Sequence, residues 1–186
     1  FLIVLLIGYL SVIGIETDRF NNQVSDKIKN IDEKIQLELK KIKLVLDPFK
    51  FRLNIKTVGP KIKIKENIIE LENIKARISL KALVENNFLI ENMEISTKSL
   101  EIKNLISFIR SLQNKPELFV LDKTFKKGFL IADIKLEFDT EGKIKDNYII
   151  NGLIKNTKFS FLKNYNFQKL DLIFEDKKDN LLLSDV

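Results

Sequence analysis

The chain has 186 residues, 45% hydrophobic and 31% charged, so it is long enough for one domain with a sizeable core and is neither disordered nor wholly embedded in a membrane. The net charge of +6 permits an anionic partner, but most lysines alternate with Ile or Leu near an acidic residue, which is typical of a solvated sheet face. The absence of Cys and His excludes disulfides, the usual zinc sites and nucleophiles activated by His.

Residues 1–15 read FLIVLLIGYLSVIGI and carry no charged side chain. A bilayer crossing needs about 20 apolar residues, so the run is short, but the chain opens on Phe rather than Met and we expect its beginning to be missing. A cleaved signal peptide and a buried core helix are the alternatives, although no A-x-A cleavage site follows. We predict a transmembrane anchor whose apolar residues are Phe1, Leu2, Ile3, Val4, Leu5, Leu6, Ile7, Leu10, Val12 and Ile13.

Residues 16–30 have the spacing of an amphipathic helix. Phe20, Val24 and Ile28 recur every four residues and form one apolar stripe among polar residues. Such a helix could lie on a membrane surface or cover the open edge of the strands that follow. We favour the second role, because one narrow stripe binds a membrane weakly.

Residues 31–103 alternate between apolar and charged residues, which predicts strands with one apolar and one charged face. Pro48 and the pair Gly59-Pro60 separate strands, and the short spacing of turn residues predicts antiparallel neighbours. The candidates for the apolar face in this segment are Ile35, Leu37, Leu39, Ile42, Leu44, Leu46, Phe49, Phe51, Leu53, Ile55, Ile62 and Ile64.

Residues 104–116 change to a helical period, with Leu105, Ile106, Ile109 and Leu112 on one face, and predict a short helix and a linker. Strands resume in residues 117–186. They carry a hairpin turn at residues 139–142 and a bulge or bend at Gly152. The last strand looks cut, so we expect a fragment of a longer protein. The candidates for the apolar face here are Ile134, Leu136 and Phe138.

No motif in the chain indicates an enzyme. The six glycines form no phosphate-binding loop, and no nucleophile elbow is present. Asp171, Glu175 and Asp176 lack a recognised cation-binding spacing. A hydrolase with paired carboxylates stays open but disfavoured, because most carboxylates alternate with lysines on the wet face. We therefore predict no catalytic residue, no metal and no cofactor.

An apolar sheet face must be covered. A second sheet can supply the cover and form a sandwich, which alternation alone favours. Lipid acyl chains on a strongly curved sheet can also supply it, because apolar burial stabilises by about 25 cal/mol per Å² whichever partner provides it.

The order of the predicted elements is similar to that of a known protein family. An apolar helix and an amphipathic helix precede the alternating run from Ile35 to Ile55, and further strands end in FLIENMEISTKSLEIKNL. This arrangement resembles the start of the AsmA-like proteins of Gram-negative bacteria (the TamB and YhdP type), which resemble chorein-like bridge proteins. The stretch GKIKDNYIINGLIKNTKFSF resembles their later hairpins. The resemblance implies a single-pass inner-membrane protein with its bulk in the periplasm. It also implies phospholipid transport toward the outer membrane, and phospholipid acyl chains and envelope proteins as partners.

We therefore predict a mainly β fold, in which a transmembrane helix and a short amphipathic helix precede a curved, mostly antiparallel, groove-like sheet with one short internal helix. The predicted function is phospholipid transport along the apolar face. The alternative is a tethered structural or outer-membrane assembly factor that pairs its sheet edge with a client strand. A nucleic-acid binder, which would need phosphate contacts and a steep salt dependence, is disfavoured because of the predicted membrane anchor.

Overall fold

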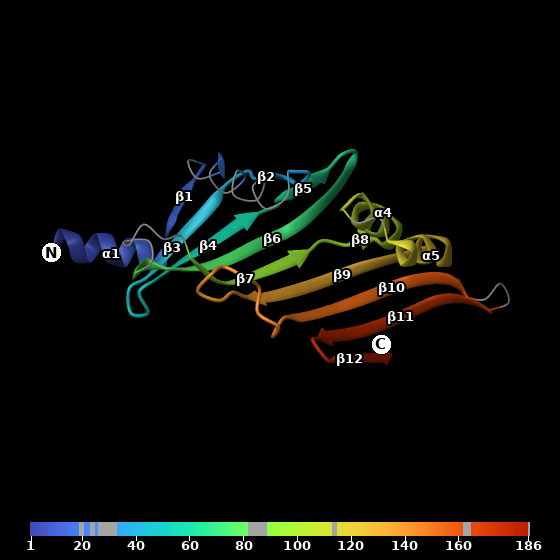
Figure 1. The fold of residues 1–186 in the computed structure, drawn as a ribbon. Helices are drawn as coiled ribbons and strands as arrows, with labels where there is room; N and C mark the ends of the chain where they lie inside the picture. Colours follow the sequence, from blue (N-terminus) through green and yellow to red (C-terminus); the bar gives the residue numbers. More distant parts are fainter. Residues whose placement is uncertain are drawn as a thin grey trace.

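The computed structural model describes residues 1–18, 21–22, 25, 33–81, 89–112, 115–161 and 165–185. Its strands form one twisted antiparallel sheet with helices at its ends (Figure 1). The sheet has 12 strands, and its main path runs β1-β3-β4-β6-β7-β9-β10-β11-β12. The strands are β1 (Ile15–Thr17), β2 (Gln36–Glu38), β3 (Ile42–Asp47), β4 (Arg52–Val58), β5 (Lys61–Ile64), β6 (Asn67–Ser79), β7 (Ile90–Thr97), β8 (Leu100–Glu101), β9 (Phe125–Glu137), β10 (Ile149–Phe161), β11 (Tyr165–Lys177) and β12 (Asn180–Asp185).

The prediction of a mainly β, antiparallel fold is confirmed. The two β segments of the sequence join across β7 and β9, which pair directly. All described strands belong to one connected sheet, so the second sheet that alternation alone favoured is not found among the described residues. The apolar face must therefore be covered in another way.

The predicted break at Gly59-Pro60 separates β4 from β5. Gly59 adopts a positive φ of 59°, and β4 and β5 on either side of it both pair with β6. β6 is 13 residues long, with its first part against β5 and its second part against β4. β5 also pairs with β2, so a small extra sheet segment forms beside the main path.

The predicted hairpin turn at residues 139–142 is present between β9 and β10. The Asp139 Oδ1 atom accepts the backbone N–H groups of Glu141 and Lys143, both at 2.9 Å. Gly142 supplies the positive φ of 80° that the turn requires. These hydrogen bonds to the charged form hold the pKa of the Asp139 carboxyl below its usual value, and the bond from Lys143 has the largest effect.

Two helices interrupt the strands. α4 (Ile102–Leu112) confirms the predicted short helix, and Ile106 and Phe108 are buried on it. α5 (Pro116–Thr124) corrects the prediction that strands resume near Leu118, since the next strand starts at Phe125. The reason is local: Pro116 stands in the first turn of α5, where its fixed φ suits a helix, and the residues after it do not alternate.

A buried cluster lies under α4. Its buried members are Ile64 of β5, Ile69 and Leu71 of β6, and Phe108 of α4. Ile74 and Ile95 from the main sheet pack against this cluster. Other apolar side chains are buried outside this cluster, among them Ile42 of β3, Ile78 of β6 and Ala132 of β9.

The N-terminal helix α1 (Leu2–Val12) is 11 residues long, or about 16 Å, whereas a bilayer core is about 30 Å thick. None of the described helices is long and apolar enough to cross a membrane. The structure gives no support to the transmembrane anchor predicted over residues 1–15. The helix ends before Gly14, whose φ is 75°, and the chain then enters β1.

The prediction for residues 16–30 is corrected at its start, because Glu16 and Thr17 are extended and pair with β3 in β1. Phe20, Val24 and Ile28, which would form the apolar stripe, lie outside the described residues. Among described residues nearby, the Asn21 Nδ2 atom donates a hydrogen bond to the Leu39 carbonyl oxygen and the Ser25 Oγ atom to that of Leu37. These bonds connect the segment to the chain around β2.

Candidate functional site

One face of the sheet is apolar along most of the main path, with Asp176 as a charged member between Ile150 and Leu181. Residues paired across neighbouring strands lie on the same face, so the register aligns Ile15, Leu44, Ile55, Ala76 and Met93 in one row. The rows continue through β9 to β12, as in the pairing of Ile154 with Leu172 and of Phe174 with Leu183. We call this surface the apolar face: Ile15, Ile42, Leu44, Leu46, Leu53, Ile55, Ile74, Ala76, Ile78, Met93, Ile95, Leu130, Ala132, Ile134, Leu136, Ile150, Gly152, Ile154, Leu172, Phe174, Leu181 and Leu183.

Exposure differs between the two faces of the sheet. On β9, Ala132 is buried and Ile134 and Leu136 are half-buried, while Lys135 and Glu137 between them are exposed. β6 has the same contrast between Ile78, which is fully buried, and Lys75 and Arg77, which are exposed. The alternation therefore corresponds to a difference in exposure between the two faces at these positions. Toward β11 the other face also carries apolar side chains, since Leu153 pairs with Ile131 and Ile173, which are 43% and 47% exposed.

The described helices cover only part of the apolar face. α4 contacts β5, β6, β8 and β9, and α5 contacts β9 and β10. None of the described helices makes an extended contact with β4, β11 or β12. At the β12 end, Leu181 and Leu183 are 59% and 60% exposed. Exposure is therefore uneven along the apolar face: Ile42 and Ile78 are fully buried, most of its members are half-buried, and its β12 end is open to solvent.

Gly152 shapes the apolar face at its centre. The ring of Phe174 from β11 occupies the space where a Cβ of Gly152 would lie, and the Ile131 carbonyl oxygen is 3.0 Å from that position. The predicted bulge or bend at Gly152 is not found, because the residue pairs regularly with Ala132 and Phe174. Its function is to let an aromatic ring lie against the backbone.

Three aromatic rings form a ladder across the strands near α5. The Phe125 and Phe159 ring centroids are 5.9 Å apart, and those of Phe159 and Phe167 are 4.6 Å apart in a stacked arrangement. They belong to β9, β10 and β11 in that order. Phe167 is 44% exposed, so an apolar molecule can reach this ladder from solvent.

The structure separates the sequence-predicted residues into three groups. The first group lies on the apolar face: Ile42, Leu44, Leu46, Leu53, Ile55, Ile134 and Leu136. The second group lies in the core or packs against it: Ile35, Leu37, Ile62 and Ile64. Leu39 is half-buried between β2 and β3, and Phe138, also half-buried, forms an isolated bridge with Ile144.

Phe49 and Phe51 form the third group, and they lie in a turn. They are 97% and 71% exposed, and Phe51 adopts a positive φ of 49°. Pro48 ends β3, and the Asp47 Oδ1 atom accepts the backbone N–H of Lys50 at 3.1 Å, which closes the turn. The alternation of Phe49 and Phe51 with charged residues therefore does not come from a strand.

Sequence reasoning missed the part of the apolar face beyond β9 that includes Ile150, Gly152, Phe174 and Leu183. A period of two in the sequence could have identified Phe174, since Leu172 and Phe174 are separated by Ile173 and followed by Glu175. No sequence signal was available for Gly152, because the role of this residue depends on a ring from the neighbouring strand.

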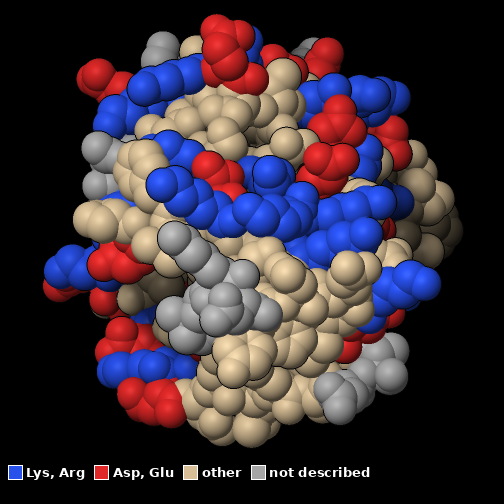
Figure 2. All heavy atoms as spheres, turned by 90° about the vertical axis from the view of Figure 1, so that its right-hand side faces the viewer, with Lys and Arg blue, Asp and Glu red and all other residues tan. Residues whose placement is uncertain are grey.

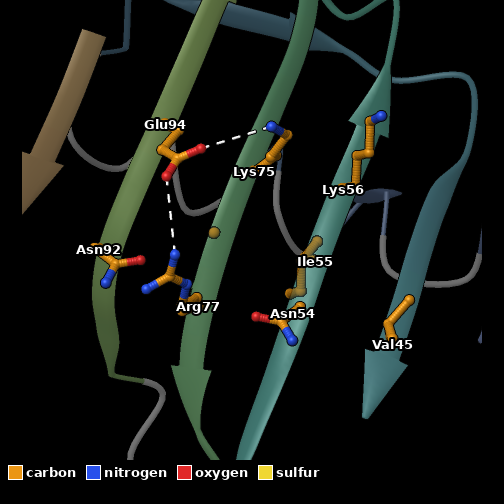
Figure 3. Close-up of a pocket in the computed structure, with 9 residues that line it drawn as sticks. Val45, Asn54, Ile55, Lys56, Lys75, Arg77, Asn92 and Glu94 are labelled. Carbon is orange, nitrogen blue, oxygen red and sulfur yellow. Dashed lines mark ion pairs between the residues drawn. The ribbon is translucent and has the colours of Figure 1, made fainter. Parts of the chain in front are cut away.

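The opposite face of the sheet is polar and contains a hollow of about 410 Å³ (Figure 3). Lys75 and Arg77 of β6 lie 3.6 Å and 3.8 Å from the Glu94 carboxylate of β7. Asn54 and Lys56 of β4 line the same hollow. Because all these side chains are exposed or half-buried, and Lys75 and Arg77 are paired with Glu94, the hollow has the character of a solvated surface.

Carboxylates elsewhere on the molecule have structural partners. Glu70 accepts hydrogen bonds from Lys61 at 2.6 Å and Lys98 at 3.0 Å, which lowers the pKa of the Glu70 carboxyl to about 2. The Asp171 Oδ1 atom accepts the backbone N–H of Asn156 at 2.7 Å. No group of three or more His, Cys, Asp or Glu side chains among the described residues could hold a metal ion.

Comparison with known proteins found no relative. No family model matches the chain, and no curated protein or solved structure gives a significant match. The argument for function therefore starts from the apolar face itself.

Proposed function

We propose that the apolar face binds the acyl chains of phospholipids and that the protein takes part in phospholipid transport. The observation that carries the proposal is the register, which aligns apolar side chains across nine strands. The described helices contact only part of this surface, its β12 end is exposed at Leu181 and Leu183, and contiguous exposed apolar patches are typical of binding sites.

Acyl chains suit this surface because it offers almost no directional groups. Two of its few polar neighbours, Thr57 and Thr97, are buried and bond to the backbone of Ile74 and Ala132. Burial of the apolar side chains by lipid contributes about 25 cal/mol per Å² without fixing the lipid at one place. Lipid can therefore slide across the strands, which suits transport better than tight storage.

The resemblance to the AsmA-like proteins extends this proposal to a location. The protein would lie in the periplasm beside the inner membrane of a bacterium and help to supply phospholipid to the outer membrane. α1 has no buried residue, and its apolar side chains could contact the bilayer. Lysines and glutamates on the opposite face of the sheet would keep that face in water.

Charged substitutions on the two faces test the proposal. Leu183→Glu on β12 adds charge to the apolar face at a side chain that is 60% exposed, so the protein should still fold. Leu182→Glu is the matched control, because Leu182 is 53% exposed on the other face of the same strand. Leu44→Glu tests the middle of the face, and Phe51→Glu, in the turn, is its control.

Each purified variant should be analysed by native mass spectrometry and lipid extraction, with circular dichroism to measure folding. We expect phospholipid to co-purify with the wild type, Leu182→Glu and Phe51→Glu, and to be lost from Leu183→Glu and Leu44→Glu. A wild type that is folded, monomeric and free of lipid would contradict the proposal.

One observation favours the alternative function of strand pairing. β12 is an edge strand with three consecutive exposed leucines, and it lacks the Pro and Lys residues that normally protect such an edge. A client strand could add to it by backbone hydrogen bonding. Capture of an extended peptide by lipid-free protein would support this alternative.

A further inference from the structure

Lysines gather where α4, β9 and β10 meet. Lys103 stands in the first turn of α4, and Lys126 and Lys127 stand at the start of β9. Lys158 of β10 is the register partner of Lys127. A small hollow of about 90 Å³ lies among them, lined by Glu101, Lys103, Lys126, Lys127, Gly128 and Phe129. Figure 2 views this end of the molecule and shows basic side chains in a band across it.

Several basic side chains elsewhere on the sheet are paired with carboxylates. Lys61, Lys75, Arg77 and Lys98 each lie within 4 Å of a carboxylate. In the described structure, by contrast, none of Lys103, Lys126, Lys127 and Lys158 forms an ion pair with a carboxylate. The Lys126 Nζ atom donates only to the Lys123 carbonyl oxygen, at 2.6 Å. Since cationic neighbours across a strand pair repel each other, an anionic partner would stabilise this end of the sheet.

Apolar side chains are exposed beside the lysines. Phe119, Val120 and Leu121 of α5 are 43%, 64% and 41% exposed. Arg110 of α4 holds this helix in place, with its guanidinium 4.0 Å from the Phe119 ring centroid and 2.7 Å from the Asp122 carboxylate. Exposed apolar residues beside a basic cluster are typical of segments that lie in the interface of an anionic bilayer.

The same end of the molecule is continuous with the apolar face. α5 passes directly into β9 at Phe125, and Phe125 is the first ring of the aromatic ladder. The ladder continues over Phe159 to Phe167. An acyl chain that leaves a bilayer at α5 would therefore contact the apolar side chains of the ladder directly after α5.

We propose that this end of the molecule docks on the surface of a bilayer that contains anionic phospholipid. The phosphate groups of the lipids bind Lys103, Lys126 and Lys127, and the apolar side chains of α5 enter the interface. The aromatic ladder then leads acyl chains to the apolar face. This last step rests on the proposed transport function, whereas docking itself does not.

Vesicle flotation with the full chain tests the docking. The vesicles are phosphatidylcholine alone, or phosphatidylcholine mixed with phosphatidylglycerol. The test variant combines Lys103→Glu, Lys126→Glu and Lys127→Glu. The control combines Lys40→Glu, Lys50→Glu and Lys81→Glu, which changes the net charge equally at exposed lysines outside this end. Contact between α1 and lipid does not depend on lipid charge. The difference in binding between the two vesicle types therefore excludes any contribution of α1.

We expect the test variant to bind mixed vesicles at least about a hundredfold more weakly than the wild type, since each of the three lysines near an anionic surface contributes roughly a fivefold gain in affinity. Binding to neutral vesicles should not change, and the control should resemble the wild type. A second variant, Val120→Ser with Leu121→Ser, should weaken the binding that persists at high salt.

Three outcomes would overturn the docking proposal. The test variant could bind mixed vesicles as the wild type does, or the control could lose as much binding as the test variant, which would show an effect of net charge alone. Duplex DNA could also displace the wild type from vesicles with equal affinity, which would indicate a nucleic-acid partner. A wild type that floats with mixed vesicles but carries no phospholipid would contradict transport and leave docking intact, so failures of the two proposals are distinguishable.

Discussion

At the scale of single residues, Gly152 shows how close contact between neighbouring strands shapes the apolar face. A methyl group at this position would overlap the Phe174 ring and approach the Ile131 carbonyl oxygen. We expect Gly152→Ala to lower the free energy of unfolding by about 1–3 kcal/mol, the usual cost of overpacking. Thermal denaturation measures the change.

The control for this substitution is Gly8→Ala in α1, where no atom lies within 4 Å of the added Cβ. Alanine favours a helix over glycine, so this variant should be as stable as the wild type or slightly more stable. Equal stability of Gly152→Ala and the wild type would show that Phe174 can move away without cost.

Glu70 makes the stability of the protein depend on pH. Hydrogen bonds from Lys61 and then Lys98 lower its carboxyl pKa in the folded state from 4.5 to about 2. A lowered pKa adds stability above the unfolded-state value, and this stability is lost as the pH falls through the folded-state value. The wild type should therefore be more stable than Glu70→Gln at neutral pH, and this difference should shrink between about pH 4.5 and pH 2.

Melting temperatures of both proteins across this pH range measure the difference. The effect should be modest, because the carboxylate lies at the surface and solvent screens the ion pairs. High salt should reduce it further. A difference between the two proteins that is constant down to pH 2 would contradict the low pKa of Glu70 in the folded protein.

At the scale of elements, α4 is the helix that forms the core with the sheet. Phe108 is 8% exposed and packs with Ile64, Ile69 and Leu71. We expect Phe108→Ala to lower the free energy of unfolding by about 3–5 kcal/mol, because it removes a buried ring and leaves a cavity. Chemical denaturation measures this loss.

Phe49→Ala is the matched control at the element scale, since Phe49 is 97% exposed in the β3–β4 turn. It should change the free energy of unfolding by no more than about 0.5 kcal/mol. A small effect of Phe108→Ala would mean that the sheet is stable without the α4 contact.

At the scale of the whole molecule, the uncovered apolar face predicts stabilisation by lipid. A ligand that binds only the folded state raises the free energy of unfolding by about 2.7 kcal/mol at a concentration one hundred times its Kd. For a chain of this size, we expect a short-chain phospholipid below its micellar concentration to raise the Tm by about 5 °C or more. Differential scanning fluorimetry of the wild type measures the shift.

Leu183→Glu should reduce this thermal shift and Leu182→Glu should not, because only Leu183 lies on the apolar face. An equal shift in both variants would place the lipid elsewhere, for example on α1. No shift in the wild type would mean that the apolar face does not bind phospholipid.

The sequence by itself determined the strands and the separation of apolar from charged side chains. The alternation of Ile42 and Leu44 with Lys41 and Lys43, and of Ile134 and Leu136 with charged neighbours, is a local property that a strand converts directly into two faces. The helical period of residues 104–112 and the hairpin turn at Asp139 are local in the same way, and both were predicted correctly.

Only the tertiary structure decided which strands pair, and therefore which apolar residues share a surface. Ile62 and Ile64 alternate as Ile42 and Leu44 do, but Gly59-Pro60 diverts their strand to the core under α4. Phe49 and Phe51 continue the alternation through a turn. The single sheet, and an apolar face of which much has no described helix over it, result from pairing between residues far apart in the chain, and alternation within one strand carries no information about such partners.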